Sequence, residues 1–225
     1  MLRSKIKILM VLLVVLGPIS ISSANEQLRE LNRQATEAMD KGDLKTAINL
    51  FSQAGMQGYA MSQFNAGILY LKYANGNHEY LDIGQTWIMK AAKQEFPDAV
   101  QKVGDLFRMG LKSKKGVIIN QDMDEAFLWY RKGAELGNPY SQNNIGYYYL
   151  NGISVPKNPE KGFYWYLKAA EQGLASAQLQ VGVMYASGMG VKKNMAEAKQ
   201  WVGLVKDKGV PQAAEKWDEL GLSKY

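Results

Sequence analysis

The sequence of 225 residues contains no cysteine and a single histidine, His78. Without cysteine the chain has no disulfide, no thiol nucleophile and no thiolate metal site. One histidine excludes zinc sites built on two or three histidines and leaves little for histidine-dependent catalysis. Because 47% of the residues are apolar and 11% aromatic, the composition is still that of a folded protein with a substantial core.

Long hydrophobic runs are also lacking. The longest apolar run covers residues 8–16, about half of the ~18–20 residues needed to cross a bilayer. It follows a basic stretch and precedes a break at Gly17-Pro18 and small residues that end at Ala24. This order is typical of a secretory signal, so we predict a signal peptide over residues 1–24, cleaved after Ala24. A permanent anchor is the alternative. We therefore expect an exported protein, periplasmic in the first place and secreted in the second.

The positive charge is modest once this segment is set aside. The chain has 27 Lys+Arg and 21 Asp+Glu, a formal net charge of +6. Three of the basic residues, Arg3, Lys5 and Lys7, lie in the predicted signal peptide, which leaves a net charge of +3. Such a balance does not indicate a nucleic-acid partner.

What the sequence does contain is an internal repeat. Two residue types recur every 36 positions: Trp129, Trp165 and Trp201, and Gly137, Gly173 and Gly209. A second set of glycines, each followed three positions later by an aromatic residue, extends the same phase: Gly67, Gly104, Gly146 and Gly182. Six extra residues lie in the loop between Gly104 and Trp129. Each unit shows two segments of helical periodicity, which predicts a helix pair per repeat.

The start of each helix is marked by its own residues. Asn158 is suited to cap a second helix through its side-chain oxygen, and Pro159 suits the first helical position, where no N–H partner is needed. Asp122 and Asn194 occupy the same phase as Asn158. Glycine inside a helix costs about 1 kcal/mol relative to alanine. Its recurrence at positions 67, 104, 146 and 182 therefore predicts a helix contact too close for a Cβ atom.

This pattern, most complete over residues 145–173, resembles the Sel-1-like repeat, a relative of the tetratricopeptide repeat. It reads Ile-Gly-x-x-Tyr, a loop, and then a second helix with Trp-x-x-Lys-Ala-Ala-x-x-Gly. The resemblance covers about residues 60–210. It departs from the pattern in the unit that ends near Glu95, which stands where a helix-ending glycine belongs, and at Val205-Lys206, which replaces Ala-Ala.

The resemblance implies an all-α fold: a right-handed α/α superhelical solenoid of about five helix pairs plus a C-terminal capping helix. Its first helices would line the concave side. We predict a tetratricopeptide-like helix pair over residues 25–58. The region 59–210 is predicted to contain four Sel-1-like repeats, over 59–95, 96–137, 138–173 and 174–209. A capping helix and tail follow over 211–225.

Two sets of residues are candidates for contacting a partner. The first is a stripe at helical spacing on the first helices: Phe64, Ile68 and Leu71; Gln101, Asp105 and Arg108; Asn143, Tyr147 and Leu150; Leu179, Val183 and Ala186. Its alternative role is packing between neighbouring first helices. The second is a set of loop lysines expected on one edge of the solenoid, Lys112, Lys114 and Lys115, followed by Lys157, Lys161, Lys192 and Lys193. A lysine edge suits an acidic protein or anionic headgroups, and its alternative role is solubility.

Chemical sites are weaker candidates. Asp122 with Asp124 and Glu125 has the composition of a carboxylate metal site, but its phase makes Asp122 a helix cap. His78 is expected in an irregular loop without a Ser or Asp partner. Five clustered tyrosines indicate either core or interface: Tyr140, Tyr147, Tyr148, Tyr164 and Tyr166. No catalytic, cofactor or metal residues are predicted.

The expected function is therefore binding of another protein, through the concave side and the loop edge, by a non-catalytic exported scaffold. Peripheral membrane contact through the loop lysines is compatible with this. Proteins resembling this chain also imply two alternatives. One is a periplasmic immunity protein that neutralises a secreted toxin, such as a type VI phospholipase effector. The other is binding or hydrolysis of β-lactams, which cysteine-rich relatives bind and which the missing cysteines disfavour. The partner and the oligomeric state stay open.

Overall fold

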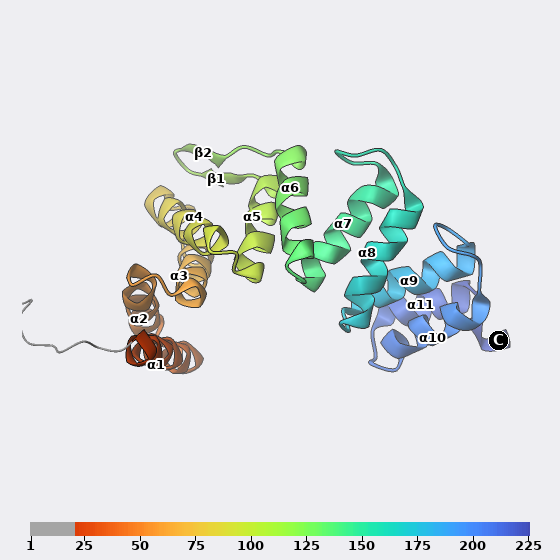
Figure 1. Cartoon of the computed structure of the whole chain (residues 1–225), viewed down its shortest axis with the longest axis horizontal. Coiled ribbons are helices and arrows are strands. Elements are labelled where there is room, and N and C mark those ends of the chain that lie inside the picture. The colour runs from red at the N-terminus through yellow and green to blue at the C-terminus, as the bar shows by residue number, and fades with distance from the viewer. Residues whose placement is uncertain (1–20) are drawn as a thin grey trace, which may run out of the picture.

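The computed structural model describes residues 21–225, so most of the predicted signal peptide lies outside the described residues. Eleven α-helices follow one another in this part of the chain (Figure 1). Five pairs come first: α1 (Ile21–Asp40) with α2 (Leu44–Met56), α3 (Ala60–Lys72) with α4 (His78–Lys93), α5 (Pro97–Met109) with α6 (Met123–Glu135), α7 (Pro139–Asn151) with α8 (Pro159–Glu171), and α9 (Ala175–Ser187) with α10 (Met195–Lys206). The single helix α11 (Pro211–Glu219) and a short 3₁₀ turn (Leu222–Lys224) end the chain.

Each helix packs chiefly against the helix before it and the helix after it, as in a solenoid. The five pairs are stacked one after another and form an arch in Figure 1, and α11 packs on the last pair. The predicted all-α solenoid with a capping helix is thus confirmed. Among residues 21–225, no helix is long and apolar enough to cross a membrane.

The second helices begin at the residues that the repeat phase predicted. Asn158 Oδ1 accepts a hydrogen bond from the Lys161 N–H at 2.8 Å, and Asn194 caps α10 in the same way. Asp122 Oδ1 accepts from the backbone of Asp124 and Glu125 at 3.0 and 2.9 Å. These bonds satisfy backbone donors that the first turn of a helix leaves without an intrahelical partner. The carboxylate of Asp122 is therefore a helix cap, as its phase predicted.

The repeating glycines mark close helix contacts, as predicted. A Cβ atom added at Gly104 would lie 2.6 Å from two ring carbons of Tyr130, and one at Gly182 would lie 2.6 Å from Val202. At Gly67 the same atom would lie 2.6 Å from Ile88. In these pairs the first helix therefore approaches the second too closely for a Cβ atom at the glycine position.

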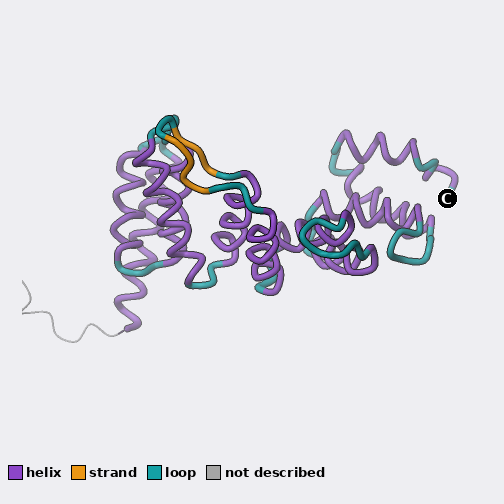
Figure 2. Tube along the Cα trace, turned by 90° about the horizontal axis from the view of Figure 1, so that it is seen from above, coloured by secondary structure: helices purple, strands orange, loops and turns teal. Residues whose placement is uncertain are grey.

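The loop between α5 and α6, which contains the six extra residues, forms an antiparallel hairpin of β1 (Leu111–Ser113) and β2 (Gly116–Ile119). The sequence pattern did not predict this hairpin. Figure 2 shows it reaching from α5 and α6 to the loop between α3 and α4. There the N–H of Lys114 donates to the Gly76 carbonyl at 3.3 Å. The hairpin thus ties two neighbouring repeats together at their loops.

The hairpin also corrects the prediction for His78. This residue is the first residue of α4, not part of an irregular loop, and its Nδ1 lies 2.8 Å from Ser113 Oγ. Ser113 is 35 positions further along the chain. Sequence reasoning missed this pair because only the docked hairpin brings the two residues together.

The core is divided among the helix junctions. Five apolar clusters of buried residues follow one another along the described chain, each shared by neighbouring helices. In the last cluster the fully buried Leu222 of the 3₁₀ turn packs with Val202 and Ala213. The tail therefore closes the end of the solenoid, which would otherwise expose an apolar face.

Candidate protein-binding surface

The first-helix stripe, defined above by its twelve residues from Phe64 to Ala186, has three different parts. Its N-terminal part on α3 is packed between helices. Phe64 lies 5.5 Å from Phe96, centroid to centroid. Leu71 packs against α4 so closely that a Cβ atom at Gly84 would lie 2.8 Å from it. Phe64, Ile68 and Leu71 are half-buried against the central apolar cluster. The contacts of these three residues therefore agree with the alternative prediction, packing between helices, and not with an open binding surface.

The C-terminal part of the stripe behaves in the same way. Leu150 and Leu179 pack against the clusters around α8 and α10, and Ala186 is buried. Val183 is half-buried. Asn143 lies at the side of this part, with its Oδ1 3.4 Å from the hydroxyl of Ser176 on α9. Of these contacts, the one between Asn143 and Ser176 joins two consecutive first helices, α7 and α9.

The middle of the stripe is a polar network centred on α5. Gln101 Nε2 donates to Asp105 Oδ2 at 2.7 Å. The hydroxyl of Tyr130, from α6, donates to Asp105 Oδ1 at 2.7 Å and accepts from Nε of Arg108 at 3.0 Å. Nη2 of Arg108 lies 3.9 Å from the same carboxylate oxygen. The structure thus joins Gln101, Asp105 and Arg108, three predicted site residues, through one phenol.

Tyr130 was not among the predicted site residues. It occupies the core position that holds Ile88 and Val202 in other repeats, so its phase alone indicates a buried side chain. Burial, and then the hydrogen bond to Asp105, raise the pKa of Tyr130 well above its usual value of 10.0, and Arg108 opposes this rise. The phenol is therefore neutral at physiological pH. In that state its single proton goes to Asp105 while its oxygen accepts from Arg108.

An exposed aromatic side chain, Tyr147, is connected to this network through the buried Tyr148. The Tyr148 ring is 5.8 Å from the Tyr130 ring, and the Tyr147 ring is 6.4 Å from that of Tyr148. Tyr148 is buried, whereas Tyr147 is 51% exposed. Of the five clustered tyrosines, Tyr166 is buried as well, while Tyr140 and Tyr164 are exposed. The cluster is therefore divided between core and surface.

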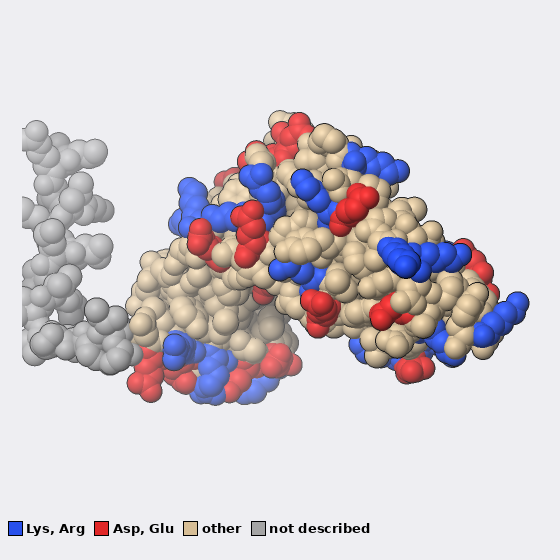
Figure 3. All heavy atoms as spheres, turned by 45° about the vertical axis from the view of Figure 1, so that its right-hand side comes forward, with Lys and Arg blue, Asp and Glu red and all other residues tan. Residues whose placement is uncertain are grey.

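The lysine edge is present as a geometrical feature. The hairpin, the α7–α8 loop and the α9–α10 loop lie along the upper side of the arch in Figure 1. Lys112, Lys114 and Lys115 on the hairpin are exposed. Lys161 is engaged, with its Nζ 5.4 Å from the centre of the Tyr149 ring. On the face shown in Figure 3, basic and acidic side chains are interspersed instead of forming a field of one sign.

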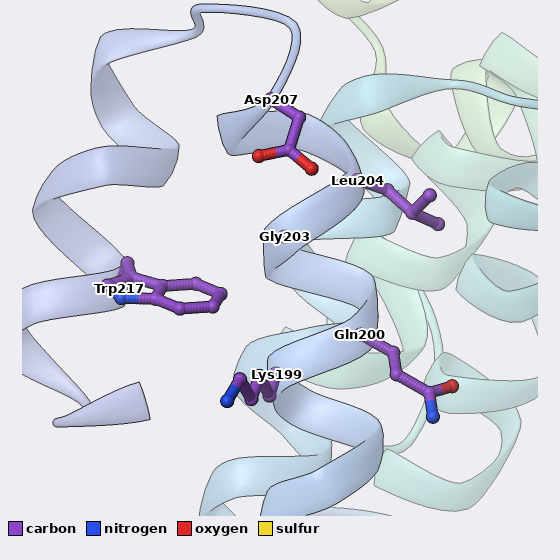
Figure 4. Close-up of a pocket in the computed structure, with 6 residues that line it drawn as sticks. All are labelled: Lys199, Gln200, Gly203, Leu204, Asp207 and Trp217. Carbon is purple, nitrogen blue, oxygen red and sulfur yellow. The ribbon is translucent and has the colours of Figure 1, made fainter. Parts of the chain in front are cut away.

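A shallow pocket of about 480 Å³ lies at the C-terminal end, between α10 and α11 (Figure 4). Trp217 of α11 points at Gly203 of α10, and the ring centre lies 4.9 Å from Nζ of Lys206 and 5.9 Å from Nζ of Lys199. Its indole covers the part of α10 on which no further helix pair packs. Trp217 is therefore part of the cap that a terminal repeat requires.

A recurring set of buried glutamines was also missed. The side-chain amides of Gln63, Gln142 and Gln178 donate to the carbonyls of Gly55, Ala134 and Ala170, at distances of 2.8, 3.3 and 3.1 Å. In each case a first helix is bonded to the end of the second helix before it. The spacing between Gln142 and Gln178 was a signal for this contact, but glutamine is common on surfaces and does not by itself indicate burial.

A model of the Sel1 repeat family matches residues 37–59, 98–138, 139–174 and 175–202, more than half of the chain. The chain belongs to the Sel1 repeat family. Glu95, where the repeat pattern departs from the consensus, falls between the first two matched ranges. No curated protein matches the chain significantly.

Solved structures of Sel1 repeat proteins share the fold. A Sel1 repeat protein from Oxalobacter formigenes is 27% identical with a TM-score of 0.75, over 90% of this chain and 81% of that one. A protective antigen of uropathogenic Escherichia coli with the same repeat fold is 26% identical with a TM-score of 0.71, over 85% of this chain and 40% of that one. An immunity protein from Pseudomonas aeruginosa is 21% identical with a TM-score of 0.52, over 89% of this chain and 69% of that one. That last similarity shows the fold alone.

Proposed function

We propose that this Sel1 repeat protein is an exported, non-catalytic scaffold that binds another protein through the middle of its first-helix stripe. The observation that supports this is the network of Asp105, Tyr130 and Arg108. Charged residues at helix positions that neighbouring repeats fill with apolar or aromatic side chains cost stability unless they are paired. A network held in place by a buried phenol beside the exposed Tyr147 is suited to contacts with a partner.

A photo-crosslinking experiment tests this proposal. A benzophenone amino acid replaces Tyr147 on α7 in one variant and Tyr164 on α8 in a matched control. The two tyrosines are 51% and 50% exposed, so each probe samples a similarly open surface. After irradiation of intact cells we expect a defined protein adduct at position 147 that is absent at position 164. Equal or absent crosslinking at both positions would count against binding at the stripe.

The predicted export is tested separately. A C-terminally tagged full-length chain is expected in the periplasmic fraction of a Gram-negative host, with its N-terminus at Asn25 by mass spectrometry. Retention of residues 1–24 on a membrane-associated chain would favour the permanent anchor instead. Recovery of the tagged chain from the cytoplasm would contradict export altogether.

A narrower version of the proposal is an immunity protein in the periplasm. It is supported by the fold shared with proteins described as immunity proteins of Pseudomonas aeruginosa and by the predicted export. Cells that produce the protein should then survive a periplasmic toxin encoded next to its gene. An Arg108→Gln variant should protect less well. If neither the wild type nor the Arg108→Gln variant protects the cells, the immunity role is excluded and the proposed scaffold function is unaffected.

A further inference from the structure

The repeat matched over residues 98–138, which contains α5, differs from the two matched repeats that follow it in the residues that fill the stripe. Two positions one turn apart hold Tyr147 and Leu150 on α7, and Val183 and Ala186 on α9. On α5 the same positions hold Asp105 and Arg108. The fold of the repeat does not require charge at these positions, because α7 and α9 form their helix pairs without it.

The two charges are not satisfied to the same degree. The Asp105 side chain is 18% exposed and accepts hydrogen bonds at both oxygens, from Gln101 and from Tyr130. The Arg108 side chain is 43% exposed and uses only Nε, which donates to Tyr130. Its Nη2 lies 3.9 Å from Asp105, beyond hydrogen-bond distance. Among residues 21–225, neither terminal nitrogen of Arg108 has a hydrogen-bond acceptor.

The guanidinium is therefore held in position by its inner nitrogen while its outer donors are open. Arginine presents its N–H groups in a planar fork that matches a carboxylate, and such charge-assisted pairs are short and directional. Fixing Nε on the buried Tyr130 lowers the entropy that a partner would otherwise have to remove from a long side chain. The arrangement is that of a preorganised anion receptor with one cation.

We propose that Arg108 receives an aspartate or glutamate of the bound partner, whose neighbouring apolar side chain packs on Tyr147. The proposal rests on the proposed protein-binding function and names the chemistry of the partner segment. Asp105, 3.9 Å from Nη2 of Arg108, already offsets part of the positive charge, so the open N–H groups of Arg108 suit the single charge of a carboxylate better than a more highly charged group. A phosphate dianion or a nucleic-acid backbone would bring two or more negative charges next to Asp105, and the lysines that could balance them lie on the hairpin.

Peptide selection tests this assignment without knowledge of the natural partner. Random 12-residue peptides displayed on phage are panned against the full-length protein. We expect enriched peptides to carry Asp or Glu next to an aliphatic or aromatic residue. Calorimetry then measures the Kd of each selected peptide and the Kd of the same peptide with its Asp or Glu replaced by Asn or Gln. Enriched peptides without an acidic residue, or no enrichment at all, would overturn the proposal.

A double-mutant cycle assigns the acid to its receptor. The acid-to-amide change should weaken binding to the wild type about tenfold, and binding to Arg108→Gln less than twofold. Arg108→Lys keeps the charge but lacks the planar fork, so it should recover only part of the discrimination. Arg131→Gln, which removes an exposed positive charge from α6, is the matched control and should leave the tenfold effect intact.

Tyr130 acts in this proposal as a positioning residue. Tyr130→Phe keeps both charges and the ring but removes the hydroxyl, so it should reduce the discrimination between acid and amide peptides while the apolar contribution to binding stays the same. A loss of folding would instead lower both affinities together and shift the thermal transition. An acid effect of equal size in wild type and Arg108→Gln would overturn the carboxylate receptor. Photo-crosslinking at Tyr147 would still decide separately whether the stripe binds a protein.

Discussion

Glu95→Gly should stabilise the protein even though it removes an ion pair. The second helices α2, α6 and α8 end in the same way: the residue after the C-cap is a glycine with a positive φ, between 86° and 92° at Gly58, Gly137 and Gly173. At the end of α4 this residue is Glu95, with φ of 60°. Its N–H donates to the Ala92 carbonyl at 3.0 Å, so the turn is completed in spite of the side chain.

The magnitude follows from three contributions to the free energy of unfolding. A left-handed conformation costs an L-residue about 1–2 kcal/mol, which glycine avoids. Glycine also lowers the free energy of unfolding by about 0.5–1 kcal/mol, because it gives the unfolded chain more conformational entropy. The pair between Lys132 Nζ and Glu95 Oε1, at 3.2 Å with both side chains substantially exposed, contributes at most a few tenths of a kcal/mol. The net gain is therefore about 0.5 kcal/mol.

Urea unfolding followed by circular dichroism at 222 nm measures this gain. Glu95→Ala is the matched control, because it also loses the ion pair but keeps the unfavourable backbone conformation. The difference between the glycine and alanine variants isolates the backbone and should be about 1 kcal/mol. The gain of Glu95→Gly over the wild type should grow in 1 M salt, which screens the exposed pair. A glycine variant no more stable than the alanine variant would refute the reasoning.

Three further predictions concern the contacts that build the solenoid. Gly104→Ala should lower the free energy of unfolding by about 1–3 kcal/mol, because its Cβ would collide with the Tyr130 ring. Gly203→Ala should raise it by about 0.5–1 kcal/mol, because its Cβ would make only an ordinary 3.4 Å contact with Trp217. The urea midpoints of the two variants should therefore move in opposite directions. Asn158→Ala should cost about 1 kcal/mol through the lost helix cap, and Asn158→Asp, which keeps the acceptor, should preserve stability in the same assay. Burial raises the pKa of Tyr166 above its usual value of 10.0, so the unfolded chain releases this proton at lower pH than the folded chain. Its contribution should be constant below pH about 10 and decline above it, and Tyr166→Phe should make the decline of the urea midpoint between pH 9 and 11 shallower; an unchanged decline would contradict this assignment.

The helix pairs and their caps could be predicted because they depend on local sequence. Asn158 and Pro159 suit the cap and the first position of a helix through their own side chains, and the spacing of 36 positions brings each cap to the same place in its repeat. The close contacts at Gly104 and Gly182 were predictable for a related reason. A glycine that recurs in a helix despite its cost indicates a constraint that only a near neighbour imposes.

The binding surface could be predicted only in part. Helical spacing placed Gln101, Asp105 and Arg108 on one stripe, but the same reasoning placed Phe64 and Leu71 there, and these pack against neighbouring helices. Periodicity assigns a residue to a face of its own helix. It does not determine how closely the next helix approaches that face, and this distance decides which side chains stay open.

The sequence by itself determined the all-α solenoid, the phase of its repeats and the residues at which its second helices begin, since these follow from propensities and spacings within about 40 positions. Only the tertiary structure decided three other features. It folded the extra residues after α5 into a hairpin, brought His78 to Ser113, and placed the phenol of Tyr130 between Asp105 and Arg108. These contacts join side chains from separate helices and loops, and their distances depend on how the helices pack. No local pattern carries that information.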